Sequence, residues 1–500
     1  MKNYKYIGLL LLSIGVASCD VNNELDIIEA EIVPEVALNK NGLDFSTYIS
    51  IGASFTAGYT DGAMFRAAQE NSFPNILAGK FGTEFNQPLM DDNIGGLVYG
   101  GTAVQPPRFY FNGAGPARLP ATPTTELTTV LSGPFHNFGA PGAKSFHLGV
   151  PGYGALNPYF GRMASSPSAS VLGDALATNP TFFTLSEIGG NDVLGYALSG
   201  GSGVDQTGNF DPSSYGGSDI TDPNVFASVF SGMVTALTAN GAKGVVANVP
   251  YITDLANFIT VPYNPVPLDA ETAGVVNGAY ASYNVGIQQA FTYLVAATPM
   301  TQEMADAEIA KRTITFAAGQ NAVVIIDEDL TDLTAINPGL ISMRQTTADD
   351  LLLLAGSTFI GTLADPNNPG SVNGVAVPLA DKWVLTPEEQ LAIRTATDAY
   401  NTTIAAVASS NPNIALVDFK GVLTEASSGI QFDRYTMTTS LVTGGLVSLD
   451  GVHLTARGYA LMANKILEAM DVEFGSNFTT ATDGLAKAGD YPTNYAAMLR

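Results

Sequence analysis

The chain has 500 residues, of which 46% are hydrophobic and 13% are charged, with 52 glycines and 28 prolines. This composition supports a large buried core and excludes disorder, collagen and coiled coil as the main architecture. The 46 acidic and 21 basic side chains give a formal charge of −25 at pH 7, which would repel a phosphate backbone, so nucleic acid is not an expected partner.

The first predicted element is a secretory signal peptide at residues 1–18. Lys2 and Lys5 form a basic start, and a leucine-rich apolar run follows over residues 7–17. A run of this length is too short to span the ~30 Å hydrocarbon layer as a permanent helix, so a cleaved signal is favoured.

The apolar run ends in Val16-Ala17-Ser18-Cys19, which resembles a bacterial lipobox, and Cys19 is the only cysteine in the chain. The resemblance implies that Cys19 is lipidated and that residues 19–45 form a tether. We therefore expect a lipid-anchored protein of the cell envelope, at a bacterial outer membrane or cell surface. An ordinary signal peptide with a chance cysteine is the alternative. No later stretch is apolar for long enough to span a membrane.

Short apolar runs alternate with helical patterns through the rest of the chain. We expect strands at 48–52, 182–188, 244–250, 323–327 and 414–419, and helices at 222–240, 269–298, 387–408 and 456–470. Thr386 is the expected N-cap of the third helix, and Glu389 closes a capping box with it. This alternation predicts an α/β fold with a parallel sheet covered on both faces, whose ligands bind at the carboxyl ends of the strands.

Three segments rich in Gly, Pro and Asn lack clear periodicity. We interpret residues 60–135, 251–268 and 329–385 as insertions into the α/β domain, and no role is assigned to residues 471–500. The apolar and Pro-bearing segment 251–268 could cap an acyl-binding cleft, with ordinary packing over the sheet as the equal alternative.

The chain has only three histidines, so any mechanism with a histidine base must use His136, His147 or His453. His453 lies just before the last predicted helix. Asp450, three residues earlier, could orient its imidazole, although this spacing is also common by chance. We interpret His136 and His147 as structural or substrate-lining.

Polar residues follow the first two predicted strands. Ser54 comes directly after the strand at 48–52, where a nucleophile or a helix N-cap serine would lie. The Asn191 amide, after the second strand, could donate to an oxyanion. Between them, Gly142 could bring a backbone N–H group into the same pocket.

Taken in order, these blocks resemble the SGNH hydrolases, or GDSL lipase/esterase family, over residues 46–470. The resemblance implies a three-layer α/β/α fold with a mostly parallel, flavodoxin-like, five-stranded sheet. It implies Ser54 as nucleophile, Asp450 and His453 as its partners, and an oxyanion hole formed by Ser54, Gly142 and Asn191. The family's Gly-Asp-Ser-Leu is Gly52-Ala53-Ser54-Phe55 here, so a supporting carboxylate is missing at residue 53. No metal or organic cofactor is implied.

The expected function is hydrolysis of a carboxylic ester, as in a carboxylesterase or lipase, through an acyl-enzyme on Ser54. Two alternatives remain open: a polysaccharide O-acetyl esterase, and a non-catalytic surface lipoprotein that binds glycan or lipid. An α/β-hydrolase is disfavoured because no serine has the flanking Gly-x-Ser-x-Gly pattern. The acidic run at 327–332 could bind calcium, but it lacks the glycine and final glutamate of an EF-hand loop, so a solvated acidic loop is favoured.

Overall fold

A computed structural model describes residues 35–500 of the chain. The predicted signal peptide, Cys19 and the first part of the predicted tether lie outside the described residues. Residues 38–500 form one compact unit. In residues 35–500, no helix combines the length and the apolar character needed to cross a membrane.

The centre of the fold is a sheet of five parallel strands. Its spatial order is β6 (Asn137–Gly139), β1 (Tyr48–Gly52), β7 (Phe182–Leu185), β8 (Lys243–Ala247) and β15 (Ile414–Val417). Numbered along the chain, this is the order 2-1-3-4-5 of a doubly wound sheet, with its switch point between β1 and β7. Every residue of β1 is buried, as expected for a parallel strand covered on both faces. The prediction of an α/β fold with a five-stranded parallel sheet is confirmed.

One strand of the sheet differs from the prediction. The apolar run at 323–327 does not join the central sheet. It forms β11 (Val324–Ile326), which pairs antiparallel with β12 (Met343–Gln345). The fifth place is taken by β6, which has only three residues. An apolar run indicates that a strand is buried but not in which sheet, and a three-residue strand has no recognisable period.

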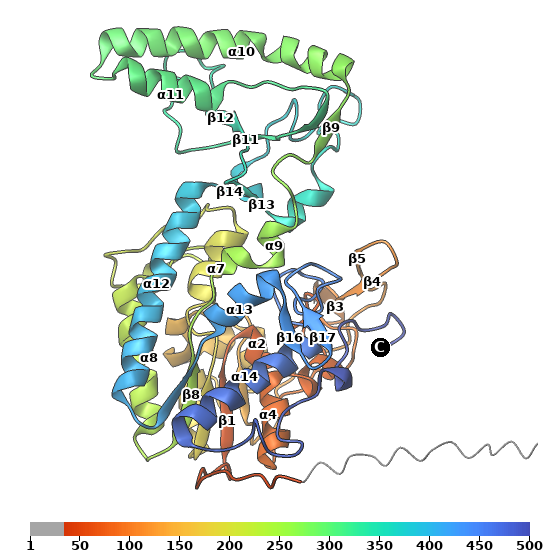
Figure 1. The fold of residues 1–500 in the computed structure, drawn as a ribbon, viewed down its shortest axis with the longest axis vertical. Helices are drawn as coiled ribbons and strands as arrows, with labels where there is room; N and C mark the ends of the chain where they lie inside the picture. The colour runs from red at the N-terminus through yellow and green to blue at the C-terminus, as the bar shows by residue number, and fades with distance from the viewer. Residues whose placement is uncertain (1–34) are drawn as a thin grey trace, which may run out of the picture. The chain divides into compact units, whose positions relative to one another are not determined.

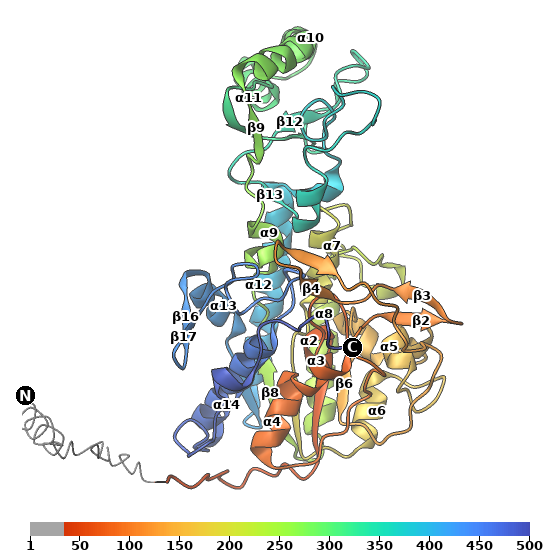
Figure 2. The ribbon, with the colours of Figure 1, turned by 90° about the vertical axis from the view of Figure 1, so that its right-hand side faces the viewer.

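Helices cover both faces of the sheet (Figures 1 and 2). Two helices, α4 (Phe73–Phe81) and α14 (Ala456–Phe474), lie together on one face. Three others, α6 (Val171–Ala177), α8 (Pro223–Thr238) and α12 (Pro387–Ser410), lie together on the other. This arrangement is consistent with a three-layer α/β fold. Helix α4 lies inside the predicted insertion 60–135, so part of that segment belongs to the layer that covers the sheet.

Local signals set the helix ends. In α12, the Thr386 hydroxyl accepts a hydrogen bond from the Glu389 N–H and the Glu389 carboxylate accepts one from the Thr386 N–H, which confirms the predicted capping box. Helix α14 begins after Thr455, whose hydroxyl accepts from the Gly458 N–H. It ends at Gly475, which has a left-handed conformation.

Residues 261–384 form a second module with its own hydrophobic core. The predicted helix at 269–298 is present as α10 (Ala270–Ala297), but it lies in this module, against α11 (Gln302–Arg312), and not on the central sheet (Figure 1). The module therefore joins the end of the predicted insertion 251–268 to nearly all of the insertion 329–385 in one folded part. Its remaining paired strands are short: β9 (Val266–Leu268), β10 (Gly319–Asn321), β13 (Leu351–Leu352) and β14 (Val384–Leu385).

The C-terminal residues 471–500 pack against the segment 60–135. The buried guanidinium of Arg108 donates hydrogen bonds to the carbonyl groups of Tyr495, Ala496 and Leu499.

The remaining short elements are α2 (Ser54–Ala57), α3 (Arg66–Glu70), α5 (Pro158–Gly161), α7 (Asn191–Leu198), α9 (Ala256–Ile259), α13 (Phe419–Ser428), β2 (Leu97–Tyr99), β3 (Thr102–Gln105), β4 (Phe109–Phe111), β5 (Pro116–Arg118), β16 (Ile430–Phe432) and β17 (Tyr435–Met437).

Candidate active site

The predicted site residues follow three neighbouring strands of the sheet. Ser54 opens α2 just after β1, Gly142 follows β6, and Asn191 opens α7 after β7. Because β6, β1 and β7 are adjacent and parallel, their carboxyl ends lie along the same edge. This edge contains the switch point, where doubly wound sheets bind ligands.

Ser54, His453 and Asp450 form a continuous hydrogen-bonded chain. The Ser54 hydroxyl oxygen lies 2.9 Å from Nε2 of His453, and Nδ1 of His453 lies 2.8 Å from Oδ2 of Asp450. Ser54 is 8% exposed. The contact of Asp450 with His453, expected from their spacing, is therefore present. The sequence places Ser54 and His453 399 residues apart, and the fold brings them together.

The Asp450 carboxylate is held by several donors. Its Oδ1 accepts from the backbone N–H groups of Val452 and His453 at 2.8 Å each, and its Oδ2 also accepts from the Gly62 N–H at 2.7 Å. Burial raises the pKa of Asp450, but the charge of His453 and these hydrogen bonds together lower it more, so the net pKa lies well below the usual range. An ionised Asp450 accepts the Nδ1–H of His453, which leaves Nε2 as the acceptor that faces Ser54.

The three predicted oxyanion donors differ in the hydrogen bonds that they already make. The backbone N–H groups of Ser54 and Gly142 donate to no other group of residues 35–500. Gly142 has a φ of +79°, a conformation that favours glycine. The Asn191 amide donates one hydrogen bond to the Ala143 carbonyl at 2.9 Å, and its second N–H remains for another acceptor. The Asn191 amide thus lies directly beside the loop that carries Gly142.

A carboxylate that sequence analysis missed supports the loop of Ser54. Oε1 of Glu187 accepts hydrogen bonds from the backbone N–H groups of Ala53 at 2.7 Å and Thr56 at 2.8 Å, and Oε2 accepts from the Thr56 hydroxyl at 3.1 Å. Burial raises the pKa of Glu187 to about 7, against the lowering effect of these hydrogen bonds. The one feature of the sequence that could have indicated Glu187 was its position as an acidic residue near the end of the apolar run 182–188.

Asp61 is a second missed carboxylate. It is 1% exposed, its Oδ1 accepts from the Leu449 N–H at 3.0 Å, and its own N–H donates to the Ser448 hydroxyl at 3.1 Å. Burial raises the pKa of Asp61 to about 7, and the nearby charge of Asp450 adds to the increase. Asp61 therefore links the predicted insertion 60–135 to the loop that carries Asp450.

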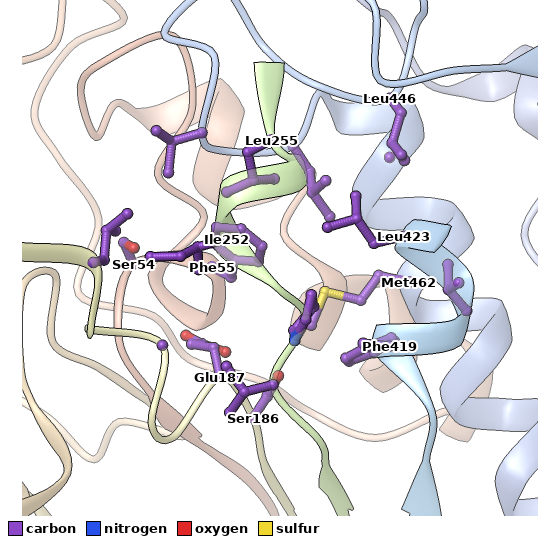
Figure 3. Close-up of a pocket in the computed structure, with 18 of the residues that line it drawn as sticks. Ser54, Phe55, Ser186, Glu187, Ile252, Leu255, Phe419, Leu423, Leu446 and Met462 are labelled. Carbon is purple, nitrogen blue, oxygen red and sulfur yellow. The ribbon is translucent and has the colours of Figure 1, made fainter. Parts of the chain in front are cut away.

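A largely apolar cavity of about 120 Å³ opens beside Ser54. Ser54, Glu187 and Asn191 line its polar side. Apolar side chains from the segment after β8, from α13, and from α14 with the loop before it line most of the rest (Figure 3). The apolar members labelled in Figure 3 are Phe55, Ile252, Leu255, Phe419, Leu423, Leu446 and Met462.

Residues of the segment 251–268 lie both at the cavity and in the main core. Ile252 and Leu255 line the cavity, whereas Phe258 is fully buried in the main core.

The other two histidines have partners outside the cavity lining. Nδ1 of His136 accepts from the Asn86 N–H at 2.9 Å. Nδ1 of His147 accepts from the Lys144 N–H at 3.1 Å, and its ring stacks on Tyr153. Burial lowers the pKa of both imidazoles. Their contacts agree with the structural role that was one of the two expectations.

The acidic run 327–332 is only partly a solvated loop. Asp327 is 4% exposed and forms an ion pair with Arg344, which also contacts Asp350. Glu328 instead belongs to a cluster with Asp381 and Glu389, the group in residues 35–500 whose spacing could hold a metal ion. No member of this cluster lines the cavity beside Ser54.

No protein-family model, curated protein or solved structure matches this chain.

Proposed function

We propose that the chain is a serine ester hydrolase of the SGNH type that acts through an acyl-enzyme on Ser54. The observation that carries this proposal is the Ser54–His453–Asp450 chain, with distances of 2.9 Å and 2.8 Å. The order of the five strands and the position of Ser54 at the switch point also support it.

In the proposed mechanism, Nε2 of His453 accepts the Ser54 proton while Oγ attacks the ester carbonyl. Asp450 stabilises the resulting imidazolium, and the imidazolium then protonates the leaving alcohol. The N–H groups of Ser54 and Gly142 and the Asn191 amide stabilise the oxyanion. Water then releases the acid, with His453 again acting as base.

The cavity beside Ser54 favours an ester with an apolar acyl group. Its apolar lining suits an acyl chain better than a sugar. A carboxylic ester with an apolar acyl group is therefore the proposed substrate class. Export and a lipid anchor at Cys19 remain part of the proposal from sequence alone.

The test is hydrolysis of p-nitrophenyl esters from acetate to palmitate by the purified protein and its Ser54→Ala variant. We expect turnover that falls by a factor on the order of 10⁶ in the variant, and the ester series gives the acyl-chain preference. Ser46→Ala, an exposed serine at the opposite end of β1, is the matched control and should retain activity. Turnover that survives Ser54→Ala would contradict the proposal. No turnover on these esters or on acetylated glycans would favour the non-catalytic alternative.

A further inference from the structure

Three carboxylates meet at the junction between the second module and the α/β layers. Glu328 follows β11, Asp381 opens a 3-10 turn just before β14, and Glu389 lies in the first turn of α12. One carboxylate oxygen from each lies within 4.8 Å of the other two. The cluster thus combines two residues of the module with one from a helix that covers the central sheet.

Two of these carboxylates have buried oxygens without a donor. Glu389 is 4% exposed, and its Oε1 has no hydrogen-bond partner, while its Oε2 accepts from the Thr386 N–H at 2.6 Å. Oδ1 of Asp381 is also buried and without a partner. A buried carboxylate oxygen is unfavourable unless it is paired or coordinates a cation.

No basic side chain neutralises the cluster. Within residues 35–500, none of the three carboxylates takes part in an ion pair. The neighbouring Asp327 differs, since it pairs with Arg344. Burial raises the pKa of Asp381 and of Glu389, and repulsion raises them further, from Glu328 on Asp381 and from Asp381 on Glu389.

We propose that Glu328, Asp381 and Glu389 bind one Ca²⁺ ion that joins the second module to α12. The donor set consists only of carboxylate oxygens, which hard cations prefer. Oxygens on opposite sides of a Ca²⁺ ion lie about 4.6–5.2 Å apart, twice the Ca–O distance of about 2.3–2.6 Å, so one ion can contact all three groups. The ion would supply the partner that the buried oxygens of Glu389 and Asp381 lack, and water would complete its coordination.

The test is calorimetric titration of the purified, chelator-treated protein with CaCl₂, together with thermal unfolding in chelator and in CaCl₂. We expect one binding site and a higher unfolding midpoint in Ca²⁺, by about 2–4 °C. Absence of Ca²⁺ binding at millimolar concentration would overturn the proposal. An equal effect of MgCl₂ would overturn the assignment to Ca²⁺, because Mg²⁺ dehydrates reluctantly and requires a tighter, octahedral shell.

Two variants locate the site. Glu389→Gln preserves the capping box but removes one charge, so we expect at least tenfold weaker Ca²⁺ binding and a higher unfolding midpoint in chelator than for the unchanged protein. Glu328→Gln replaces an exposed cluster residue and should weaken Ca²⁺ binding without affecting the fold. The matched control is Asp332→Asn, since Asp332 lies in the same acidic run but accepts hydrogen bonds from Thr334. Unchanged binding in both cluster variants would overturn the proposed site.

Discussion

Ala53 stands where the resemblance to SGNH hydrolases implies a carboxylate, yet a carboxylate contacts this loop. It comes from Glu187, on the adjacent strand connection, and it holds the backbone N–H groups of Ala53 and Thr56 on either side of Ser54. A side chain at Gly52 would not fit, because its Cβ would lie 2.8 Å from Oε1 of Glu187 and 2.7 Å from the Ser186 carbonyl oxygen. The support for the proposed nucleophile is therefore preserved by a residue that is distant in sequence.

Glu187 is a positioning residue in the proposed reaction, and its substitution should lower kcat more than it changes KM. We expect Glu187→Ala to reduce kcat by about 10²-fold, because the Ser54 loop loses three hydrogen bonds and a small displacement of the nucleophile is costly. Glu187→Gln keeps an acceptor oxygen for the two backbone N–H groups and should recover most of the activity. The measurement is steady-state hydrolysis of a short-chain ester. Equal activity of all three proteins would show that Glu187 does not position Ser54.

At the scale of elements, α13 forms one wall of the cavity. Val422 and Leu423 line the cavity from this helix. We expect Val422→Phe to shorten the space for the acyl group, with kcat/KM reduced about tenfold on the longest ester that the unchanged protein accepts and little changed on acetate. The assay is the p-nitrophenyl ester series described above.

The control for this variant is Val472→Phe, which adds the same ring at a position of α14 that is 88% exposed. A parallel loss on acetate and on the longer ester in Val422→Phe would indicate damage to the fold and not a smaller acyl site.

Elements with strong local signals were predictable, whereas those defined by tertiary pairing were not. Helix α12 begins where its capping box predicts, because Thr386 and Glu389, which cap its N-terminus, are only three residues apart in sequence. Strand β6 has three residues and exists through its pairing with β1, so its local sequence indicates only a turn. Helix α10 was predicted correctly, but its sequence does not reveal that it packs in a separate module.

The candidate site shows the same division. Ser54 was predictable because it directly follows a predicted strand, and His453 because it is one of only three histidines and lies three residues after Asp450. Glu187 and Asp61 were not, since their contacts with Ala53 and Leu449 join segments more than a hundred residues apart.

At the scale of the whole molecule, the burial of a few acidic side chains makes the stability of the fold depend on pH. The chain has 46 acidic side chains. Two of them, Asp61 and Glu187, lie in the interior, and burial raises the pKa of each to about 7. The ordinary pKa values are 3.8 for an aspartate and 4.5 for a glutamate side chain. Between those values and about 7, the folded chain keeps protons on both groups that the unfolded chain has lost. These two groups therefore make the folded state less stable as pH rises through this range.

Asp61→Asn isolates one of these groups, because asparagine keeps an oxygen for the Leu449 N–H but does not ionise. Relative to the unchanged protein, the variant should gain stability as pH rises from about 4 to above 7, by on the order of 4 kcal/mol at about 1.36 kcal/mol per pKa unit. The measurement is urea-induced unfolding of both proteins at several pH values across this range. The exposed Asp44 is the control. Hydrogen bonds from Ser46, the backbone bond first, lower its pKa, so Asp44→Asn should gain no stability as pH rises. If the difference between the Asp61→Asn variant and the unchanged protein is independent of pH, Asp61 is ionised throughout and its charge is stabilised within the fold.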